Sequence, residues 1–343
     1  MAMPFQLSEE ECQSLRVVFL APFAPERGSP RPQRHPKVGV RPIYHWEIYR
    51  ILDELGVLTA TCNDLDRLPD LVRDSNYVFS LFSRAPFRNC EIYVPAICSR
   101  LGIAVMGAPP NVRALAEDKH HAKAVVAQAG IPVVPGVAYG RSIDIPARPP
   151  MAGPYFVKYR FGSASEDVTM ECATDSWDAA ADKARQFLTQ GKDAVIETLI
   201  PGIDVTVPVL GGDVPIVLTP VAEISSLTHG IATFEQKRFL TAARRRELFA
   251  DSEMAEQARE LSRRVVAEFQ PFDYMRVDFR FDPVERRLMF MECNISCNLG
   301  STAALMLSAR HHGISQAAVV EHILAYSHRR QTEVGRAWQT VNV

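Results

Sequence analysis

The chain has 343 residues, of which 47% are hydrophobic and 23% are charged, and its formal net charge is -2. Its length allows about two or three domains, and its small net charge gives no electrostatic reason to bind nucleic acid or a membrane surface. No segment approaches the roughly 20 apolar residues of a membrane span, the acidic start lacks a secretory signal, and the cysteines are scattered. We therefore predict a cytoplasmic globular protein with reduced thiols.

Residues 1–110 are predicted to form an N-terminal α/β domain. Buried strands are expected at 16–21, 77–82 and 103–106, and helices at 44–55 and 92–101. Strands that alternate with helices imply a parallel sheet covered on both faces. No Gly-x-Gly-x-x-Gly run follows these strands, which argues against a dinucleotide-binding domain. The stretch 22–42, rich in Pro and Arg, is predicted to be a long loop or a lid.

From residue 111 onward the chain continues as helices and strands without an internal repeat. Helices are predicted at 111–129, 177–189, 254–269, 302–311 and 315–327, and strands at 154–158, 194–197 and 205–210.

The segment 274–294 is predicted to be a β-hairpin. Apolar and charged residues alternate in its first half, residues 283–287 carry turn chemistry, and an apolar strand returns. The hairpin can set Asp278 beside Glu292 and Asn294 on one face. Two carboxylates and an amide side by side suit Mg2+, which prefers oxygen ligands. A solvated strand face is the alternative interpretation.

Further features accompany this hairpin along the chain. Lys119 lies in a predicted helix, and Lys158 ends a strand before the loop Gly-Ser-Ala-Ser at 162–165, whose backbone N–H groups could wrap phosphate oxygens. Glu197 follows an apolar strand, and Asp204 follows a Pro-Gly turn. A basic run, which is usually solvated surface, contains Lys237, Arg238 and residues 244–246.

The order of these features resembles the ATP-grasp fold, and within it the D-alanine–D-alanine ligase group of carboxylate–amine ligases. The resemblance covers about residues 110–328 and includes EDKHHAKAVVAQAGIPVVPG, VIETLIPGIDVTVPVLGG and FMECNIS. It implies an α/β (α+β ATP-grasp) protein in which two subdomains clamp ATP between them. The implied domains are an N-terminal parallel α/β domain (1–110), a central subdomain (111–196), a C-terminal subdomain (197–330) and a tail (331–343).

The resemblance also implies ATP and Mg2+ as cofactors, with two ions expected and Mn2+ as a substitute. It implies that the phosphates are bound by Lys119, Lys158 and Lys237, the adenine by Glu197, Thr198 and Ile200, the ribose by Asp204, and the metal by Asp278, Glu292 and Asn294. Arg276 would stabilise the charge that develops during catalysis, Ser163 would belong to the loop that closes over the phosphates, and backbone N–H groups near Asn298 would hold an oxyanion.

The chain departs from that family in the amino-acid pockets. Asn298 stands where an oxyanion glycine is expected, and Ala303 where a serine would hold the carboxylate of the second substrate. Arg238 replaces a tyrosine after the lid lysine. The candidates for substrate recognition are therefore Arg238, Glu26, Arg84, Arg88, Asn89 and Glu91, and a charged surface loop is the alternative for the last four.

We therefore predict an ADP-forming ligase that activates a carboxylate as an acyl phosphate and couples it to the amine of an amino acid or dipeptide-like compound. One alternative is D-alanine–D-alanine ligation with a diverged pocket, and another is a nucleotide-binding protein without catalysis. The expected partners are the small-molecule carboxylate and amine, with neither nucleic acid nor a membrane. A homodimer is implied only by the resemblance.

Overall fold

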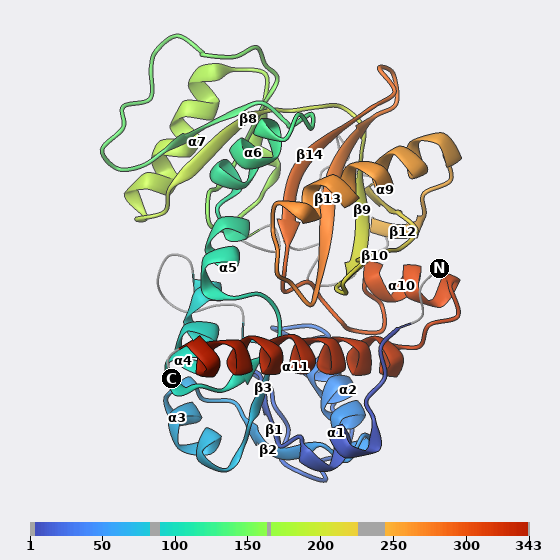
Figure 1. The fold of residues 1–343 in the computed structure, drawn as a ribbon. Coiled ribbons are helices and arrows are strands. Elements are labelled where there is room, and N and C mark those ends of the chain that lie inside the picture. The colour runs from blue at the N-terminus through green and yellow to red at the C-terminus, as the bar shows by residue number, and fades with distance from the viewer. Residues whose placement is uncertain (1–3, 83–89, 163–165, 226–243, 342–343) are drawn as a thin grey trace.

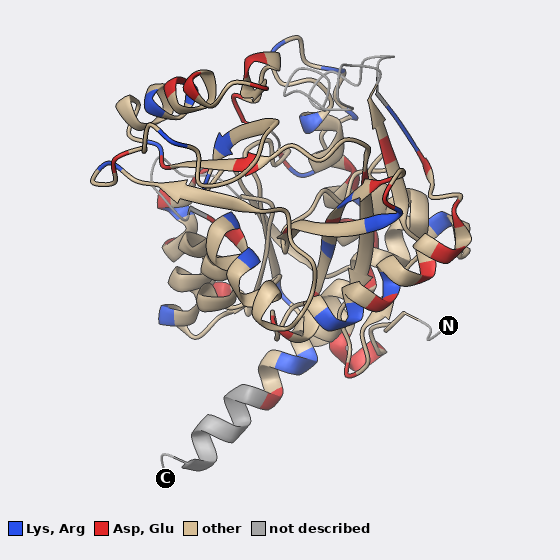
Figure 2. Ribbon diagram, turned by 90° about the horizontal axis from the view of Figure 1, so that it is seen from above, with Lys and Arg blue, Asp and Glu red and all other residues tan. Residues whose placement is uncertain are grey.

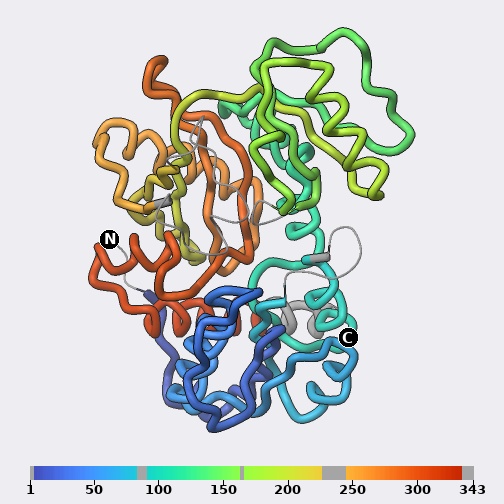
Figure 3. Tube along the Cα trace, turned by 180° about the vertical axis from the view of Figure 1, so that it is seen from behind, coloured from blue at the N-terminus to red at the C-terminus, as the bar shows by residue number. Residues whose placement is uncertain are grey.

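The structure is a computed structural model that describes residues 4–82, 90–162, 166–225 and 244–341. Within these ranges the strands form three sheets, one at the base of the molecule and one in each of two lobes above it (Figures 1 and 3). Basic and acidic positions are interspersed along the helices and strands (Figure 2). The predicted residues Arg84, Arg88, Asn89, Ser163, Lys237 and Arg238 lie outside the described residues.

The N-terminal sheet is parallel and has the order β2-β1-β3-β4. Its elements are α1 (Glu9–Ser14), β1 (Val17–Leu20), α2 (Arg41–Glu54), β2 (Leu58–Cys62), α3 (Leu68–Leu71), β3 (Tyr77–Ser80), α4 (Tyr93–Leu101) and β4 (Ala104–Val105). Val17 and Phe19 enter one core cluster while Val18 and Leu20 enter another, so apolar side chains cover both faces of the sheet, as expected. The sequence did not predict β2, whose central residues are partly exposed.

The loop at 22–40 packs against α2. The backbone N–H of Gly28 donates to the Tyr49 hydroxyl at 2.8 Å, and Trp46 Nε1 donates to the carbonyl of Ser29 at 3.0 Å. The N–H of Phe23 donates to His45 Nδ1 at 3.1 Å. These contacts fix the proline-rich loop to the helix that follows it.

The central lobe consists of an antiparallel sheet with the order β5-β8-β6-β7 and the helices beside it. Its elements are α5 (Pro110–Glu117), α6 (Lys119–Gln128), β5 (Gly136–Tyr139), β6 (Tyr155–Tyr159), β7 (Ala173–Thr174), α7 (Trp177–Thr189) and β8 (Ala194–Thr198). The single helix predicted at 111–129 is broken at Asp118, because its side chain accepts hydrogen bonds from the N–H groups of His120 and His121 and caps α6.

The C-terminal lobe is built on a six-stranded sheet with the order β12-β11-β9-β13-β14, in which β10 also pairs with β9. Its elements are β9 (Ile203–Leu210), β10 (Ile216–Val217), β11 (Val221–Ser225), β12 (Arg244–Leu248), α9 (Ser252–Ala267), β13 (Tyr274–Asp282), β14 (Arg287–Asn294) and α10 (Ala304–His311). The predicted hairpin is confirmed, and Asp278 pairs directly with Glu292.

The last helix, α11 (Gln316–Val341), runs along the base of both lobes (Figure 1). It continues through the described part of the predicted tail. Val319, Val320, Ile323 and Leu324 are fully buried and join the core cluster that contains β1 and α2. The C-terminal helix therefore completes the core of the N-terminal sheet.

We predict that His322 of α11 makes the fold sensitive to acid. Its Nδ1 accepts from the N–H of Phe5 at 2.9 Å and its Nε2 lies 2.9 Å from the carbonyl of Gly211, so the ring is neutral. Burial lowers its pKa to about 4. The unfolded chain binds a proton near pH 6.5, so the stability that this residue contributes is present above that pH and is lost as the pH falls toward 4.

We expect His322 to lower the free energy of unfolding by on the order of 2–3 kcal/mol across this window. Urea denaturation at pH 7 and pH 4.5 measures the effect. His322→Gln should show a weaker dependence on pH, whereas His35→Gln on the exposed loop should behave like the parent protein. An equal dependence in all three proteins would assign the acid sensitivity to other groups.

Candidate functional site

A cleft with about 990 Å3 of space, part of it open to solvent, lies between the two upper lobes. The predicted residues that line it are Lys119, Lys158, Glu197, Thr198, Ile200, Asp204, Arg276, Asp278 and Glu292. Asn294 contacts the side chain of Glu292 on its own strand, β14, and that of Asp278 on the neighbouring strand, β13. Glu26, Glu91 and Asn298 are not part of the lining.

The charged wall of the cleft follows from the two-residue period of the six-stranded sheet. Alternate residues of β9 and β13, such as Val205, Val207, Val277 and Phe279, enter the core on one face. The residues between them face the cleft. Strand pairing sets Arg246, Glu223, Asp204 and Arg280 in one row across the sheet, and Thr206, Asp278 and Glu292 in a second.

The second row contains two of the predicted metal ligands, Asp278 and Glu292, and the third, Asn294, follows Glu292 by two residues on β14. Asn294 Nδ2 lies 3.0 Å from Asp278 Oδ2 and 3.4 Å from Glu292 Oε1, and the hydroxyl of Thr206 donates to Asp278 Oδ1 at 2.8 Å. Burial raises the pKa of Asp278 to about 6, with Arg276 opposing the rise and Glu292 adding to it. A bound cation would relieve this repulsion between the carboxylates.

These three side chains fit Mg2+ as a partial ligand set. The described residues contain no cluster of three or more His, Cys, Asp or Glu side chains suited to a metal. Two carboxylates and an amide oxygen match a cation that keeps several waters and takes substrate phosphates as further ligands. Rotation of the Asn294 amide by about 180° would point its oxygen, in place of its nitrogen, toward a metal. The two orientations differ only in the hydrogen bonds that the amide makes with its neighbours.

Arg276 lies beside this set. Its Nε is 3.1 Å from Asp278 Oδ2, yet this buried N–H makes no hydrogen bond of good geometry among the described residues. Burial lowers the pKa of Arg276, but Asp278 outweighs burial and holds that pKa above its ordinary value. An orphaned, charged donor at the edge of a cleft is suited to an anionic ligand oxygen.

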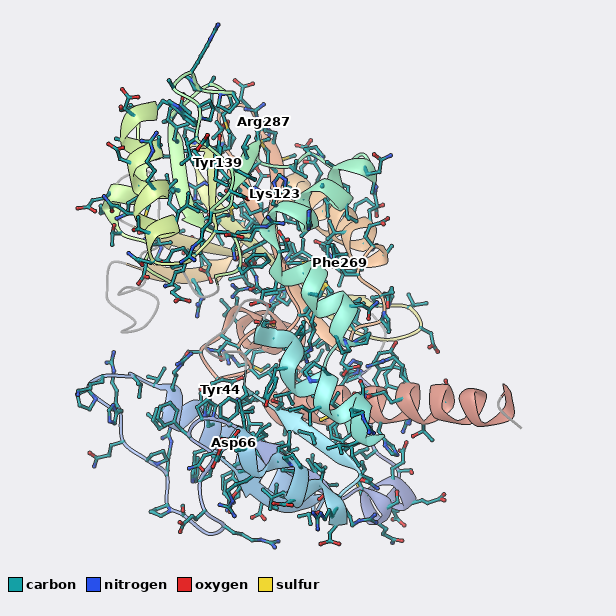
Figure 4. The ribbon with its side chains drawn as sticks, turned by 90° about the vertical axis from the view of Figure 1, so that its left-hand side faces the viewer. Tyr44, Asp66, Lys123, Tyr139, Phe269 and Arg287 are labelled. Carbon is teal, nitrogen blue, oxygen red and sulfur yellow. The ribbon has the colours of Figure 1, made fainter. Side chains whose placement is uncertain are left out.

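Glu197 lies between two buried lysines. Its Oε2 is 3.0 Å from Lys158 Nζ, and its Oε1 accepts a short hydrogen bond from Lys123 Nζ. Burial raises the pKa of Glu197, but the two lysines outweigh burial and hold that pKa below its ordinary value. Sequence reasoning missed Lys123, although it follows Lys119 by one helical turn. Figure 4 shows Lys123 on α6 in the upper part of the molecule.

Lys119 connects Gly162, at the start of the loop predicted to bind phosphate, with the predicted metal ligands. Its Nζ donates to the carbonyl of Gly162 and lies 3.6 Å from Glu292 Oε2. Next to it, Arg160 makes a bidentate pair with Asp118, at 2.8 and 2.6 Å, which ties the same loop to the cap of α6.

Arg280 is a second charged residue of the site that sequence reasoning missed. Its Nη1 donates to Asp204 Oδ1 at 2.7 Å, and its Nε donates to the carbonyl of Ile200 at 2.9 Å. Arg280 therefore holds both the segment after β8 that contains Ile200 and the carboxylate of Asp204, which is predicted to bind the ribose.

Hydrogen bonds hold the loop after Asn294 to the N-terminal domain. Asn298 Oδ1 accepts from the N–H of Gly300 at 2.6 Å. The hydroxyl of Tyr44 accepts from the N–H of Leu299 at 3.3 Å, and Glu47 accepts from the N–H of Ser301 at 3.1 Å. Tyr44, which Figure 4 shows on α2 below the lobes, thus joins the N-terminal domain to this loop.

Comparisons with known proteins agree with this arrangement. A family model described as "D-ala D-ala ligase C-terminus" matches residues 125–325. The D-alanine–D-alanine ligase of Oleidesulfovibrio alaskensis is 25% identical over 297 residues, which cover 83% of this chain and 92% of that protein. The D-alanine–D-alanine ligase of Caulobacter sp. (strain K31) is 27% identical over 250 residues, covering 71% of this chain and 75% of that protein.

Solved structures share the whole fold. The D-alanine–D-alanine ligase of Bacillus anthracis complexed with ATP has a TM-score of 0.73 at 17% identity, covering 93% of this chain and 99% of that one. The VanG D-Ala:D-Ser ligase of Enterococcus faecalis has a TM-score of 0.65 at 15% identity, covering 92% of this chain and 100% of that one.

The fold and site thus define an ATP-grasp protein of the ATP-dependent carboxylate–amine ligase class. The family match spans more than half of the chain, and the chain belongs to the D-alanine–D-alanine ligase family. Among the described residues, the structure has no helix that is both long and apolar enough to span a membrane.

We predict that Lys123 is required for the stability of the end of the cleft that contains Glu197. Lys123→Met leaves the buried Glu197 with a single cationic partner, and we expect the free energy of unfolding to fall by about 3 kcal/mol. Urea denaturation measures this change. Arg185→Met, which breaks an exposed pair with Asp182, is the matched control and should cost about 0.5 kcal/mol or less.

The double variant Lys123→Met/Glu197→Gln should recover part of the loss, because it removes the unpaired carboxylate. A loss in Lys123→Met no larger than that in the Arg185 control would contradict the role of the lysine pair.

Proposed function

We propose that the protein transfers the γ-phosphate of ATP to a small carboxylic acid and joins the activated acid to the amine of an amino acid or dipeptide-like compound. The observation that carries this proposal is the sheet face on which Asp278, Glu292 and Asn294 lie beside the guanidinium of Arg276, which is 3.1 Å from Asp278. Carboxylates, an amide and a cation in one cleft are the groups that phosphoryl transfer requires.

The nucleotide end of the proposal rests on the lining of the cleft. Apolar residues of both lobes, namely Val134, Phe156, Val168, Leu199, Ile200 and Met291, provide surfaces for an adenine ring. Glu197 and the backbone of Thr198 and Ile200 would recognise the edge of the base, and Asp204, fixed by Arg280, would accept from the ribose hydroxyls. Lys119, Lys158 and Lys237 would hold the phosphates.

Asp278, Glu292 and Asn294 would hold Mg2+, as two ions by resemblance and with Mn2+ as a substitute, and the metal would neutralise phosphate charge during the transfer. A carboxylate of the substrate is repelled by the γ-phosphate, so cationic side chains must offset both charges. The guanidinium of Arg276, which lines the cleft, would stabilise charge on the transferred phosphate. Lys119 is placed to keep the loop that opens at Gly162 near that phosphate.

The chemistry then proceeds in two steps. A substrate carboxylate oxygen attacks the γ-phosphorus and the bond to ADP breaks, which yields an acyl phosphate. The amine nitrogen next attacks the acyl carbon, the C–O bond to phosphate breaks, and phosphate leaves with the electron pair as the amide forms. Backbone N–H groups near Asn298 would stabilise the oxyanion. Ser163 and Lys237 would belong to loops that exclude water.

The identity of the substrates is the open part of the proposal. Relatives of this chain are D-alanine–D-alanine ligases, which makes D-alanine the second candidate. Ala303 and Asn298 at the acceptor end favour another amino acid, because neither supplies the group expected at its position. Arg84, Arg88, Asn89, Glu91 and Arg238 stay candidates for substrate recognition, as does Glu26 on the exposed loop. We extend the proposal to a homodimer in the cytoplasm.

Hydroxylamine trapping tests the proposal. The protein is incubated with ATP, Mg2+, hydroxylamine and a panel of D- and L-amino acids and other small carboxylates, and hydroxamate and ADP are measured. We expect both products with at least one carboxylate. Nucleotide binding without either product would support the non-catalytic alternative. Turnover restricted to D-alanine as both substrates would identify a D-alanine–D-alanine ligase.

We predict that Glu292→Gln abolishes turnover. The change removes one negative metal ligand, so hydroxamate formation should fall by about 100-fold or more. Glu285→Gln in the exposed hairpin turn is the control and should keep the parent rate. Circular dichroism and ADP binding without Mg2+ should match the parent in both variants. An active Glu292→Gln protein would show that the metal ligands are wrongly assigned.

A further inference from the structure

Lys192 is the centre of a charged cluster outside the residues that the family resemblance assigns. It lies in the short connection between α7 and β8. Its Nζ is 3.0 Å from Glu166 Oε1 and 3.0 Å from Asp167 Oδ2. The same ammonium lies over the ring of Tyr159, 4.0 Å from the ring centroid. Lys192 thus contacts two carboxylates and an aromatic face at once.

Glu166 brings this cluster to the edge of the cleft. It directly follows the loop 162–165, which is predicted to bind phosphate, and both Gly162 and Glu166 line the cleft. Lys192 is not among the lining residues. A carboxylate in the wall of a cleft repels the phosphates of a nucleotide unless a cation offsets its charge. Lys192 supplies that cation from outside the lining.

Tyr159 fixes the second carboxylate of the cluster. Its hydroxyl donates a short hydrogen bond to Asp167 Oδ2. The Tyr159 hydroxyl and the Lys192 ammonium hold the pKa of Asp167 below its ordinary value, although burial opposes them. Asp167 has a φ of 52°, in the left-handed region that most side chains avoid, and these contacts hold the chain there. They thereby fix the residue between Glu166 and Val168, which both line the cleft.

The charges of the cluster determine what the loss of Lys192 would do. Glu166 and Asp167 share this ammonium, so its removal takes a cationic partner from both carboxylates. The added repulsion acts on the charged phosphates of a nucleotide and hardly on its uncharged adenosine part. The side chains of Glu166 and Asp167 are 32% and 53% exposed, so solvent screens the repulsion and the effect is moderate.

We propose that Lys192 is a positioning residue of the nucleotide site, which offsets the charge of Glu166 and, with Tyr159, fixes residues 166–168 at the wall of the cleft. ATP can then bind beside an acidic segment. Lys192 acts through Glu166 and Asp167 and belongs to a different connection of the same lobe. This inference rests on the nucleotide-binding part of the proposed function.

Calorimetric titration with ATP and Mg2+, without a carboxylate substrate, tests the inference, and adenosine is the comparison because it lacks phosphates. In Lys192→Met we expect the dissociation constant of ATP to rise by about 5- to 20-fold and that of adenosine to change by less than about twofold. Lys192→Arg should stay within about threefold of the parent protein, because the charge remains. Lys192 is 36% exposed, so these variants should fold, and urea denaturation checks this.

A double variant separates charge from packing. Lys192→Met/Glu166→Gln should recover most of the lost ATP affinity, because it removes the carboxylate that Lys192 offsets. Glu166→Gln alone should bind ATP at least as tightly as the parent protein. A double variant that binds ATP as weakly as Lys192→Met would contradict the electrostatic role.

Lys183→Met is the matched control. Lys183 belongs to the same lobe and makes the same kinds of contact, since its Nζ is 3.0 Å from Glu171 Oε2 and 5.6 Å from the ring centroid of Phe187. Neither partner lines the cleft. Lys183→Met should therefore keep the ATP affinity of the parent protein.

The outcomes distinguish this inference from the proposed function. A loss of ATP affinity in Lys192→Met that adenosine and the Lys183 control do not share supports the inference. Equal ATP affinity in Lys192→Met and the parent protein overturns it and leaves the proposed function intact. A parent protein that binds no ATP overturns both.

Discussion

Strand alternation in the six-stranded sheet is the constraint on which the rest of the site depends. One face is largely apolar because it packs against α5, α6 and α9, so the charged residues of the inner strands β9, β11 and β13 that line the cleft, Asp204, Glu223, Arg276, Asp278 and Arg280, lie on the other face. Buried charges are costly unless they are paired. Arg280 with Asp204 and Arg246 with Glu223 meet this requirement across strands, and the carboxylates of Asp278 and Glu292 leave an excess of negative charge that suits a metal.

The opposite lobe supplies the complementary charge. Lys123 and Lys158 share Glu197, so this buried cluster has one more cation than anion. Lys119 lies at the junction, within 3.6 Å of Glu292. One wall of the cleft thus carries carboxylates suited to a cation, and the opposite wall carries lysines. A polyphosphate with its metal would be held between these two walls. The nucleotide and its metal would thereby join two lobes whose walls carry charge of opposite sign.

The sequence was sufficient for local patterns and for the order of motifs. The hairpin at 274–294 was predictable because its period and its turn specify the register. Contacts across strands could not be predicted in the same way. The strand order β12-β11-β9-β13 brings Arg246 to Glu223 from segments that lie apart in the chain. Arg246 was part of a basic run, which predicts solvent exposure, and Lys123 resembled any helical lysine. The helix break at Asp118 was not predicted, because it depends on the hydrogen bonds by which Asp118 caps α6. Strand β2 was not predicted, because it lacks an apolar run.

The packing of α11 has a consequence for biosynthesis. Strand β1 shares its core with Val319, Val320, Ile323 and Leu324, which are synthesised much later. Contacts between such distant parts of a sequence cannot form until both have left the ribosome. We therefore expect the N-terminal sheet to acquire its final core only after α11 has left the ribosome, and the nascent chain to expose apolar surface to chaperones until then.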